Sequence, residues 1–318
     1  MNKYKVCVIG ASGLVGRTLV SELFIKKFPL KELVLCASDV SDGKEIYIDD
    51  RKFYLQKIRE DIFIDCDFVF FCAGSEVSKE WVEVARKYNC IVIDNSSYFR
   101  MRDDCSLIIP EVNIFDLDIK KVIANPNCST IQSVLCLNAL SKYGLKKVIY
   151  NTYQSISGSG NKAIIDRANY YIYDINKTCI PKIDNLYTNG FTIEEMKMIN
   201  ETKKILNLKN LDVVATCVRV PVDYCHGVSI VVELDEDVDI KKIYEDFSKQ
   251  EGIVLSESLV FDDAFGNDKV YVGRIRKDIV NSKTLMFYCI ADNLRRGAAS
   301  NAVLIALKII ENGLAYKN

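Results

Sequence analysis

The sequence predicts an α/β protein of two domains, and three observations support this. The first third of the chain alternates short apolar runs with amphipathic stretches, which indicates βαβ units and a parallel sheet with helices on both faces. Strands and helices then alternate less regularly, as in a mixed α+β domain. A length of 318 residues suits about two domains, and 49% hydrophobic residues are enough to build their cores.

The elements of the first domain follow one another as a parallel sheet requires. A strand over 4–9 runs into a glycine turn, and a helix over 14–28 follows and is stopped by Pro29. The next strands are expected over 32–37, 67–73 and 90–94, with a helix over 78–88 between the last two. This succession is that of repeated βαβ units.

The second part of the chain begins after the segment NPNCST at 125–130. A helix is expected over 131–143, followed by a long strand over 146–157 that ends in Ser-Gly-Ser-Gly. Later strands are expected over 211–218, 228–234 and 285–292, and a last helix over 297–312. This helix is apolar on one face, so we expect it to return to the first domain. The expected domains are 1–129, completed by about 297–318, and 130–296.

Composition excludes several classes of function. Forty-two Lys and Arg against 43 Asp and Glu leave a net charge of −1, so no overall field attracts nucleic acid or an anionic membrane. No apolar run reaches the roughly 18–20 residues of a membrane span. The start MNKYKVCVIG reads as a strand and not as a signal peptide. We therefore expect a cytoplasmic protein with neither a nucleic-acid nor a membrane partner.

The chain has one histidine, His226, and twelve cysteines. A metal site with several imidazoles is therefore impossible. The sequence contains no CxxC motif, which argues against a zinc ribbon or a redox pair, so no metal is expected. Most of the thiols are expected to act as small core residues in a reducing compartment. Only one side chain has an ordinary pKa near neutrality and suits acid–base work.

The glycine turn Gly10–Gly16 follows the first strand and opens the first helix. Small residues let a pyrophosphate approach the backbone, and the N–H groups at a helix N-terminus attract it. The spacing is GxxGxxG instead of GxGxxG, and a tight strand–helix turn is the alternative interpretation. Its place between the first strand and the first helix favours nucleotide binding in a Rossmann-type domain.

The segment after the second strand is expected to contact the adenosine ribose. Ser38 and Ser41 suit the phosphate of NADP. Asp39 and Asp42 would repel that phosphate and therefore suit NAD. The residues alone leave the two cofactors open.

Two further residues stand out as candidates for chemistry. Cys128 lies between a proline-containing turn and an expected helix start, where the helix dipole favours a thiolate. His226 lies beside Gly227 in a loop between two strands, seven residues after Arg219. Core packing is the alternative for Cys128, and a surface or structural role is the alternative for His226. The residues point to a nucleotide-dependent enzyme with a possible Cys–His pair and an anion-binding arginine.

These segments together resemble the aspartate-semialdehyde dehydrogenase family over nearly the whole chain. The resemblance is carried by GASGLVG (10–16), DNSSYFRM (94–101), NPNCST (125–130), YQSISGSG (153–160), EEMKM (194–198), CVRVPVDYCHG (217–227) and DNLRRGAASN (292–301). It implies a Rossmann cofactor domain, a second domain for catalysis and dimerisation, and a homodimer or homotetramer. It also implies NADPH-dependent reduction of aspartyl phosphate to the semialdehyde, in the biosynthesis of lysine, threonine, methionine and isoleucine.

The resemblance also implies roles for single residues. Cys128 is expected to attack the acyl phosphate and form a thioester, His226 to act as general acid–base, and Gln154 to orient the intermediate. The substrate is expected to meet Arg219 with its carboxylate, Glu194 with its ammonium, and three groups with its phosphate: Arg100, Asn127 and Lys197. Without the resemblance, Glu194 and Lys197 read as an exposed helical ion pair and Arg100 as a solvated loop charge.

For the cofactor, the resemblance implies a larger set of residues. They are Gly10, Ser12, Gly13, Leu14 and Val15 at the pyrophosphate, Ser38 and Ser41 at the ribose, Ala73 and Gly74 after a later strand, Ser157 and Gly158 near the nicotinamide, and Asn293. Many members of the family carry an arginine where this chain has Val40, preceded by Asp39. NADP is therefore expected, with NAD or dual use as the alternative.

Two other interpretations compete with this one. A reductase of N-acetyl-glutamyl phosphate shares the two-domain plan, but its cysteine motif differs and its substrate has no ammonium for Glu194. A non-catalytic nucleotide-binding regulator is disfavoured because Cys128, Gln154, Arg219 and His226 occur together.

Overall fold

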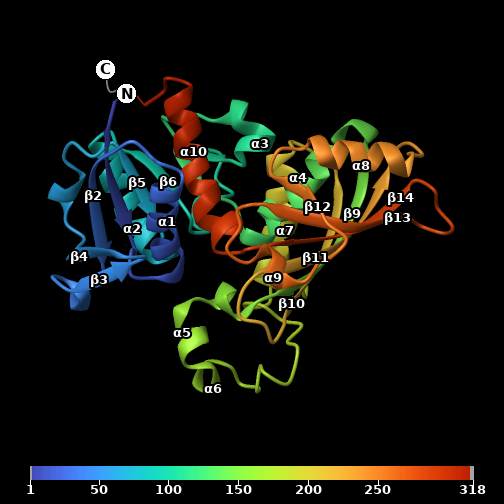
Figure 1. Cartoon of the computed structure of the whole chain (residues 1–318), viewed down its shortest axis with the longest axis horizontal. Helices are drawn as coiled ribbons and strands as arrows, with labels where there is room; N and C mark the ends of the chain where they lie inside the picture. Colours follow the sequence, from blue (N-terminus) through green and yellow to red (C-terminus); the bar gives the residue numbers. More distant parts are fainter. Residues whose placement is uncertain (1, 316–318) are drawn as a thin grey trace. The chain divides into compact units, whose positions relative to one another are not determined.

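The computed structural model describes residues 2–315, which form two compact units (Figure 1). Unit 1 comprises the described residues up to Pro126 and from Ala298 onward, and unit 2 comprises Asn127–Gly297. The first division falls three residues before the expected boundary after residue 129. The reason is local, because Asn127 is the N-cap of a helix that belongs to unit 2.

Unit 1 contains an eight-stranded sheet with the order β3-β4-β2-β1-β5-β6-β8-β7. Neighbouring strands are parallel except β3 and β4, which pair antiparallel. The strands are β1 (Tyr4–Ile9), β2 (Leu30–Ala37), β3 (Glu45–Ile48), β4 (Arg51–Lys57), β5 (Phe68–Phe71), β6 (Ile91–Asp94), β7 (Cys105–Leu107) and β8 (Val122–Ala124). The prediction of a parallel sheet is confirmed, while the β3–β4 hairpin was not expected.

The helices of unit 1 are α1 (Leu14–Ile25), α2 (Ser75–Lys87), the short α3 (Pro110–Asn113) and α10 (Ser300–Glu311). Helices α1 and α10 share one core with alternate residues of β1, such as Val6 and Val8. The α10 residue Asn301 is fully buried, and its Nδ2 donates to the carbonyl of Ile108 (3.0 Å) and to Oδ1 of Asn125 (2.7 Å). The predicted return of the last helix to the first domain is therefore confirmed.

Several element ends differ from the predicted ones for reasons visible in the backbone. The first helix ends at Ile25 and not at 28, because Lys27 takes a positive φ of 51° and the N–H of Phe28 returns to the carbonyl of Leu23 (2.8 Å). The last helix does not begin at 297 as an α-helix, because Arg295–Ala299 form a π-helical turn before α10.

Unit 2 contains a six-stranded mixed sheet with the order β10-β9-β11-β14-β13-β12. Its strands are β9 (Leu145–Gln154), β10 (Asp212–Arg219), β11 (His226–Leu234), β12 (Ile253–Leu255), β13 (Val270–Lys277) and β14 (Thr284–Ala291). Its helices are α4 (Cys128–Leu140), α5 (Asn161–Ile165), α6 (Arg167–Tyr170), α7 (Ile193–Ile205), α8 (Ile240–Lys249) and α9 (Phe261–Ala264). The predicted strand over 146–157 ends at Gln154, because Ile156–Ser159 form a 3₁₀ turn.

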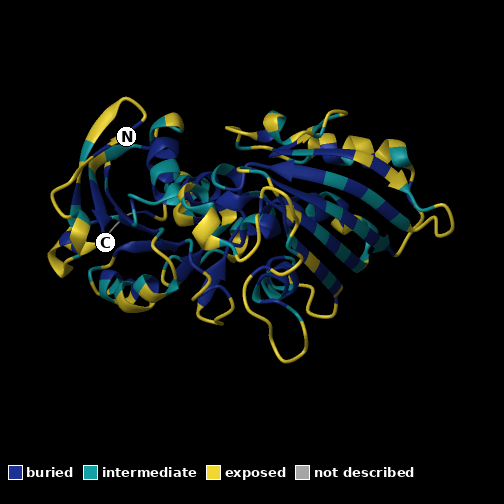
Figure 2. Cartoon of the chain, turned by 90° about the horizontal axis from the view of Figure 1, so that it is seen from below, coloured by how far each residue is buried: buried dark blue, intermediate teal, exposed yellow. Residues whose placement is uncertain are grey.

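The two faces of the unit 2 sheet differ in burial, and the strands in Figure 2 show this as alternating colours. Helices α4, α7 and α8 pack on one face. Tyr150 of β9 is fully buried there and its hydroxyl lies 3.1 Å from Oγ1 of Thr202 in α7. Ile149 and Tyr153 of the same strand project to the opposite face and keep part of their surface accessible.

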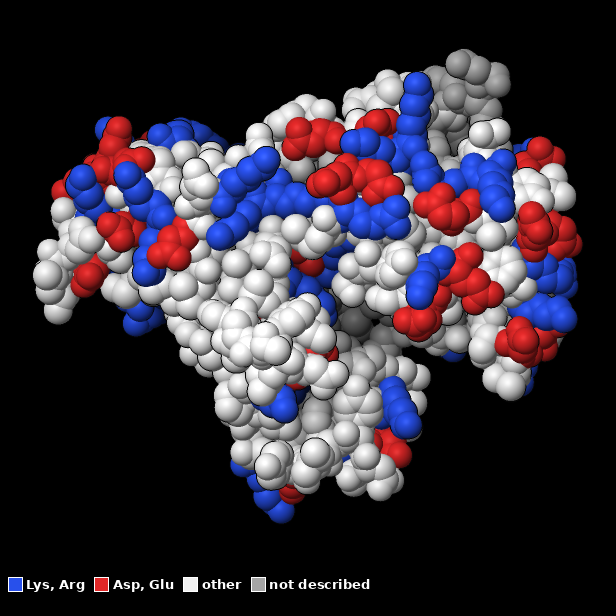
Figure 3. Space-filling view, turned by 180° about the vertical axis from the view of Figure 1, so that it is seen from behind, with Lys and Arg blue, Asp and Glu red and all other residues white. Residues whose placement is uncertain are grey.

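Charged side chains of both signs are interspersed over much of the face in Figure 3. Among residues 2–315, no helix combines the length and the apolar character that a bilayer span needs.

Candidate active site

Three of the predicted site residues occupy one rung of the unit 2 sheet. Gln154 of β9 is the register partner of Arg219 in β10 and of His226 in β11. Residues in register on neighbouring strands project to the same face, so these side chains form a row. Gln154 is 1% exposed, Arg219 5% and His226 0%. The sheet thus unites three polar residues that are far apart in the sequence.

Cys128 is the first residue of α4, which packs against the strands that carry this row. Gln132 follows Cys128 by one helical turn, and its Nε2 donates to the carbonyl of His226 (3.2 Å). Because residues four apart share one helix face, Cys128 lies on the face of α4 that is directed at the strand of His226. Cys128 is partly exposed, whereas the next three residues are buried.

The helix begins three residues earlier than predicted because Asn127 caps it. Oδ1 of Asn127 accepts the backbone N–H groups of Ser129 (3.0 Å) and Thr130 (3.1 Å). The first turn of α4 holds no acidic residue. Cys128 therefore lies at the positive end of the helix dipole, where a thiolate is favoured.

Glu194, in the first turn of α7, is 5% exposed and joins two of the predicted residues. Its Oε1 accepts Nδ2 of Asn127 (2.9 Å) and Nε2 of Gln154 (3.1 Å), and its Oε2 lies 3.2 Å from Nζ of Lys197. Burial by itself raises the pKa of this carboxyl, but Lys197 and the two amide donors outweigh burial and lower it to about 2. Glu194 is therefore a carboxylate at neutral pH.

The imidazole of His226 is held in place through its Nδ1 atom. The backbone N–H of Ser155 donates to Nδ1 (3.0 Å), and the Ser155 hydroxyl (3.1 Å) and the Cys225 carbonyl (3.0 Å) also lie within bonding distance. Within the described residues, Nε2 is buried and has no hydrogen-bond partner. Burial and the positive charge of Arg219 lower the pKa of His226 to about 3.

These contacts allow Nδ1 to be satisfied in either protonation state. A backbone N–H can only donate, so its bond from Ser155 requires Nδ1 to carry a lone pair and puts the proton of the neutral ring on Nε2. The Cys225 carbonyl can only accept, so it serves the form with the proton on Nδ1. Such an imidazole can give or take a proton at Nε2 without losing its support at Nδ1.

The loop after Gln154 passes close to Arg219 and His226. Nη1 of Arg219 donates to the carbonyl of Ser155 (2.6 Å). A Cβ on Gly158 would lie 2.7 Å from this Nη1 and 3.1 Å from Nε2 of His226, so only glycine fits without displacing them. Oδ1 of Asn293 lies 3.2 Å from the hydroxyls of both Ser155 and Ser157 and accepts the N–H of Cys225 (2.9 Å).

Two predicted phosphate-binding residues have other partners. Lys197 is 2.9 Å from Asp184 and 3.2 Å from Glu194, so the i,i+3 ion pair considered from the sequence forms, but its carboxylate is buried and not exposed. Arg100 belongs to unit 1 and is 8% exposed, with Nη2 donating to the carbonyl of Asn95 (2.8 Å). The alternative of a solvated charge is therefore wrong for Arg100.

The glycine turn of unit 1 is closely packed and leads into a helix N-terminus without a capping side chain. Gly10 has φ +85° and a Cβ there would lie 2.7 Å from the backbone of Cys72, while a Cβ on Gly16 would lie 2.2 Å from the Gly10 carbonyl. Gly13 is the N-cap of α1 and offers no side chain to the first turn, which contains no acidic residue. The predicted residues Ser12, Leu14 and Val15 lie in this turn, so it suits a dinucleotide.

The other predicted cofactor residues of unit 1 also lie after strands. Ser38 and Ser41 flank a short 3₁₀ turn after β2, with their hydroxyls 3.5 Å apart, and Val40 between them is 78% exposed. Asp39 is exposed in the same turn. Ala73 and Gly74 follow β5, and Gly74 has φ +89° with open space where a Cβ would be.

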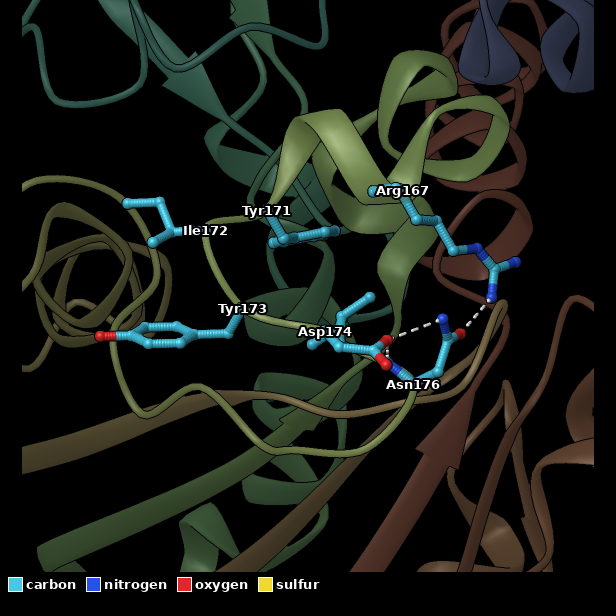
Figure 4. Close-up of a pocket in the computed structure, with 8 residues that line it drawn as sticks. Arg167, Tyr171, Ile172, Tyr173, Asp174 and Asn176 are labelled. Atoms are coloured by element: carbon cyan, nitrogen blue, oxygen red, sulfur yellow. Dashed lines mark hydrogen bonds between the residues drawn. The ribbon is translucent and has the colours of Figure 1, made fainter.

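A pocket of about 370 Å³ lies in the α6 segment of unit 2 (Figure 4). Its lining residues fall between Arg167 and Asn176. Arg167 is engaged with Asp223 (2.6 Å) and with Asn176 (3.1 Å). The pocket lining includes neither a thiol nor an imidazole, so we place the candidate active site at the row and not here.

The remaining cysteines do not compete with Cys128 for chemistry. Nine of the twelve are buried, Cys72 is partly exposed, and Cys179 is exposed. Burial raises the pKa of the Cys72, Cys217 and Cys225 thiols well above the ordinary value. Within the described part of the chain, no group of three or more His, Cys, Asp or Glu residues could hold a metal ion.

Sequence reasoning missed three residues that contact the site. Ser155 lies inside the quoted YQSISGSG segment but had no role, although it contacts Nδ1 of His226. Gln132 is one turn after Cys128, and Glu201 is two turns after Glu194 with its Oε2 accepting the N–H of Asn127 (2.6 Å). Helical spacing from Cys128 and Glu194 was the available signal.

Comparison with known proteins identifies related chains over the full length. Residues 5–120 match the family model "Semialdehyde dehydrogenase, NAD binding domain", and residues 137–296 match "Semialdehyde dehydrogenase, dimerisation domain". The aspartate-semialdehyde dehydrogenase of Aquifex aeolicus is 40% identical, with 98% of this chain and 99% of that protein covered.

Solved structures extend the similarity to the fold. The aspartate semialdehyde dehydrogenase II of Vibrio cholerae, complexed with ASA, has a TM-score of 0.94 at 36% identity and covers 98% of this chain and 99% of its own. The Candida albicans aspartate semialdehyde dehydrogenase with NADP has a TM-score of 0.79 at 22% identity, with 98% of this chain and 100% of that chain covered. At that identity the second likeness concerns the fold alone.

The buried environment of His226 predicts an imidazole that stays neutral in the folded protein. Because the chain has one histidine, isotope-labelled histidine gives one imidazole signal in NMR. We expect this signal to stay constant between about pH 5 and about pH 8. The folded-state pKa of about 3 lies below the ordinary 6.5, so the contribution to stability is complete above pH 6.5 and is lost as pH falls toward 3. A titration midpoint near 6.5 in the folded protein would contradict this.

Proposed function

The chain belongs to the aspartate-semialdehyde dehydrogenase family, and we propose that Cys128 and the row of Arg219, Gln154 and His226 form its active site. The family reaction is the reduction of L-aspartyl 4-phosphate to L-aspartate 4-semialdehyde with release of inorganic phosphate, so the chain is an oxidoreductase. One observation carries the assignment. Helix α4, which begins with Cys128, packs on the strand that carries His226, and this is the one histidine of the sequence. Relatives of this name and the buried carboxylate of Glu194 favour the aspartyl substrate over an N-acetylated one.

We assign the amino-acid end of the substrate to two buried charges. Arg219 binds the carboxylate, because a planar guanidinium fork pairs with a planar anion in a bidentate manner. Its Nη1 bond to the Ser155 carbonyl fixes the fork in place. Glu194 binds the ammonium, since its low pKa keeps it negative over the whole physiological range.

The phosphate end needs cationic and amide donors. We assign it to Lys197 and Asn127. Lys197 already lies between two carboxylates, Asp184 and Glu194, so phosphate binding competes with these ion pairs. Asn127 is one residue from Cys128, which suits a group that holds the leaving phosphate beside the nucleophile.

In the first chemical step, the Cys128 thiolate attacks the acyl carbon. A C–S bond forms, the bond from carbon to the phosphate oxygen breaks, and phosphate leaves with the electron pair and takes up a proton. The dipole of α4 favours the thiolate before attack. Covalent catalysis helps because a thioester accepts hydride more readily than a carboxylate does.

In the second step, the thioester carbon is reduced to the aldehyde. A nicotinamide dinucleotide, when bound, would supply the hydride. The imidazolium form of His226 gives its Nε2 proton to the oxygen as negative charge develops there, and the resulting neutral ring, protonated on Nδ1 beside the Cys225 carbonyl, takes the proton back as the C–S bond breaks and the thiolate leaves. Substrate binding raises the basicity of His226 for this role, because the substrate carboxylate offsets the charge of Arg219 that lowers its pKa. Gln154, beside His226 in the sheet, orients the intermediate.

We assign cofactor contacts to residues of unit 1 and, separately, to residues of unit 2. In unit 1, we assign the pyrophosphate to the turn Gly10–Val15, and further contacts to Ser38, Ser41, Ala73 and Gly74. In unit 2, we assign the nicotinamide end to Ser157, Gly158 and Asn293. Ser157 and Gly158 lie in the loop beside His226, and Oδ1 of Asn293 lies 3.2 Å from the Ser157 hydroxyl. We propose NADP as the preferred cofactor, since two hydroxyls stand together after β2.

A second copy of the chain is proposed as the occupant of the open face of the unit 2 sheet. Ile149, Val214, Val231 and Met286 lie on that face and are partly accessible, and Tyr153 is 40% exposed. Large apolar side chains on one face favour association. The match of 137–296 to a dimerisation domain makes a homodimer the assembly that we propose, in preference to a tetramer.

Replacement of Cys128 tests the covalent mechanism. We expect Cys128→Ala to abolish phosphate-dependent oxidation of aspartate semialdehyde, followed as reduced cofactor, while cofactor binding stays intact. The matched control is Cys179→Ala, which removes an exposed thiol and is expected to keep full activity. Substantial turnover in the Cys128 variant would refute the thioester. Absence of turnover in the wild-type enzyme would refute the proposed function itself.

The cofactor preference is tested by measuring kcat/KM with both dinucleotides. We expect NADP to be preferred, and Asp39→Asn to increase that preference several-fold, because an exposed negative charge beside the two serines is removed. Asp50→Asn is the control, since it removes an exposed carboxylate in the turn before β4, at the end of that strand away from the two serines, and is expected to leave the preference unchanged. A clear NAD preference of the wild-type enzyme would refute the NADP proposal.

The dimer is tested by sedimentation velocity at micromolar concentration. We expect the wild-type chain to sediment as a dimer and Ile149→Asp to sediment as a monomer, because the substitution buries a charge in the interface. Tyr244→Asp is the control, since Tyr244 of α8 is 42% exposed on the helix-covered side. A monomeric wild-type protein, or an unaffected Ile149 variant, would contradict the assignment of this face.

A further inference from the structure

Asn127, the residue before the proposed nucleophile, is held at every polar atom. Its Oδ1 caps α4 and its carbonyl accepts the N–H of Ile131 (2.9 Å). Its Nδ2 donates to Glu194 (2.9 Å), and its backbone N–H donates to Oε2 of Glu201 (2.6 Å). Two of these bonds build the helix, and the other two fasten the helix start to α7.

Both carboxylates come from one face of α7. Glu194 and Glu201 are seven residues apart, which is two helical turns, so they project from the same side toward the start of α4. Glu194 already has a proposed role with the substrate. Glu201 is 1% exposed, and the contact that relates it to the site is the backbone bond to Asn127.

We propose that Glu201 is a positioning residue, which fixes the backbone of Asn127 and thereby the place of the Cys128 thiol. A short bond from a buried N–H to a carboxylate is charge-assisted and directional, and is stronger than a bond to a neutral acceptor. This bond holds the backbone N–H of Asn127, the residue directly before the proposed nucleophile. The inference rests on the proposed function of Cys128.

Crowding on another side of Cys128 explains why a fixed backbone matters. A Cβ on Gly297 would lie 2.8 Å from Cβ of Cys128 and 3.1 Å from its Cα. The backbone of Gly297 therefore lies directly against Cα and Cβ of Cys128. Displacement of a reacting group by about 1 Å can cost roughly 100-fold in rate.

Glu195 supplies a matched comparison on the same helix. It is 8% exposed, and its carboxylate accepts the backbone N–H groups of Thr192 (2.8 Å) and Cys217 (3.2 Å). It is therefore a second buried carboxylate that bonds to backbone N–H groups, but it has no bond to Asn127 among those described. If both carboxylates only stabilise the fold, variants of Glu195 and Glu201 should behave alike. If Glu201 positions Cys128, only the Glu201 variants should lose catalytic rate.

The test compares Glu201→Ala, Glu201→Gln and Glu195→Gln in the full-length enzyme. We expect Glu201→Ala to lower kcat by roughly 30–100-fold while KM for aspartate semialdehyde changes less than about threefold, because the groups that bind the substrate remain. Glu201→Gln keeps an acceptor oxygen and is expected to restore most of kcat. Glu195→Gln is expected to lower the melting temperature with kcat within about twofold of the wild type.

Hydrogen–deuterium exchange supplies a readout that does not depend on the reaction. We expect faster exchange in the peptide that contains Asn127 and Cys128 for Glu201→Ala, and not for Glu195→Gln. Unchanged exchange, a loss confined to KM, or equal losses of kcat in the Ala, Gln and Glu195 variants would each overturn the positioning role. If the wild-type enzyme lacked the proposed activity, the exchange experiment would still decide whether Glu201 holds the backbone.

Discussion

The cap that Asn127 places on α4 is the interaction on which the candidate active site depends. One asparagine satisfies two N–H groups of the first helical turn and puts Cys128 at the first helical position. The same side chain reaches Glu194, so the helix that carries the thiol and the helix that carries the carboxylate are linked at one residue. Without this cap, the thiol would lack both its position and the favourable end of the helix dipole.

The sheet of unit 2 supplies the second constraint, because strand register decides which polar groups meet. Arg219, Gln154 and His226 share a rung, and a shift of one strand by one residue would turn its side chain to the opposite face. Glu194 is paired with Lys197, and His226 is neutral beside the charged Arg219. A substrate with one carboxylate, one ammonium and one phosphate complements this set of side chains. The set contains only a few charges of both signs, so the net charge of −1 for the whole chain does not reveal it.

Much of the fold could be predicted from the sequence, because apolar runs in unit 1 are bounded by glycine and proline. The exact ends of the helices and strands could not be predicted. Lys27 ends α1 with a positive φ, and nothing in its residue type indicates this. The antiparallel strands β3 and β4 contain charged residues and are partly exposed, so they lack the continuous apolar run of a buried strand.

Candidate site residues could be proposed from the sequence where the side chain itself suits the proposed chemistry, as for Cys128, His226 and Arg219. They could not be proposed where a residue acts through the backbone. Ser155 contacts His226 by its N–H, which every residue except proline has. Glu201 accepts a backbone N–H from a residue that lies 74 positions away in the sequence. Helical spacing places Glu201 on the same face of α7 as Glu194, but only the packing of α4 on α7 shows that its partner is Asn127.

The central claim, that Cys128 carries the acyl group, is tested most directly by trapping the acyl-enzyme. The enzyme is mixed with aspartate semialdehyde and oxidised cofactor without phosphate, and intact mass and peptide mapping follow. The account predicts one reduced cofactor per active site and one aspartyl group attached to the peptide that contains Cys128. An adduct on another of the twelve cysteines, or cofactor reduction without an adduct, would contradict it.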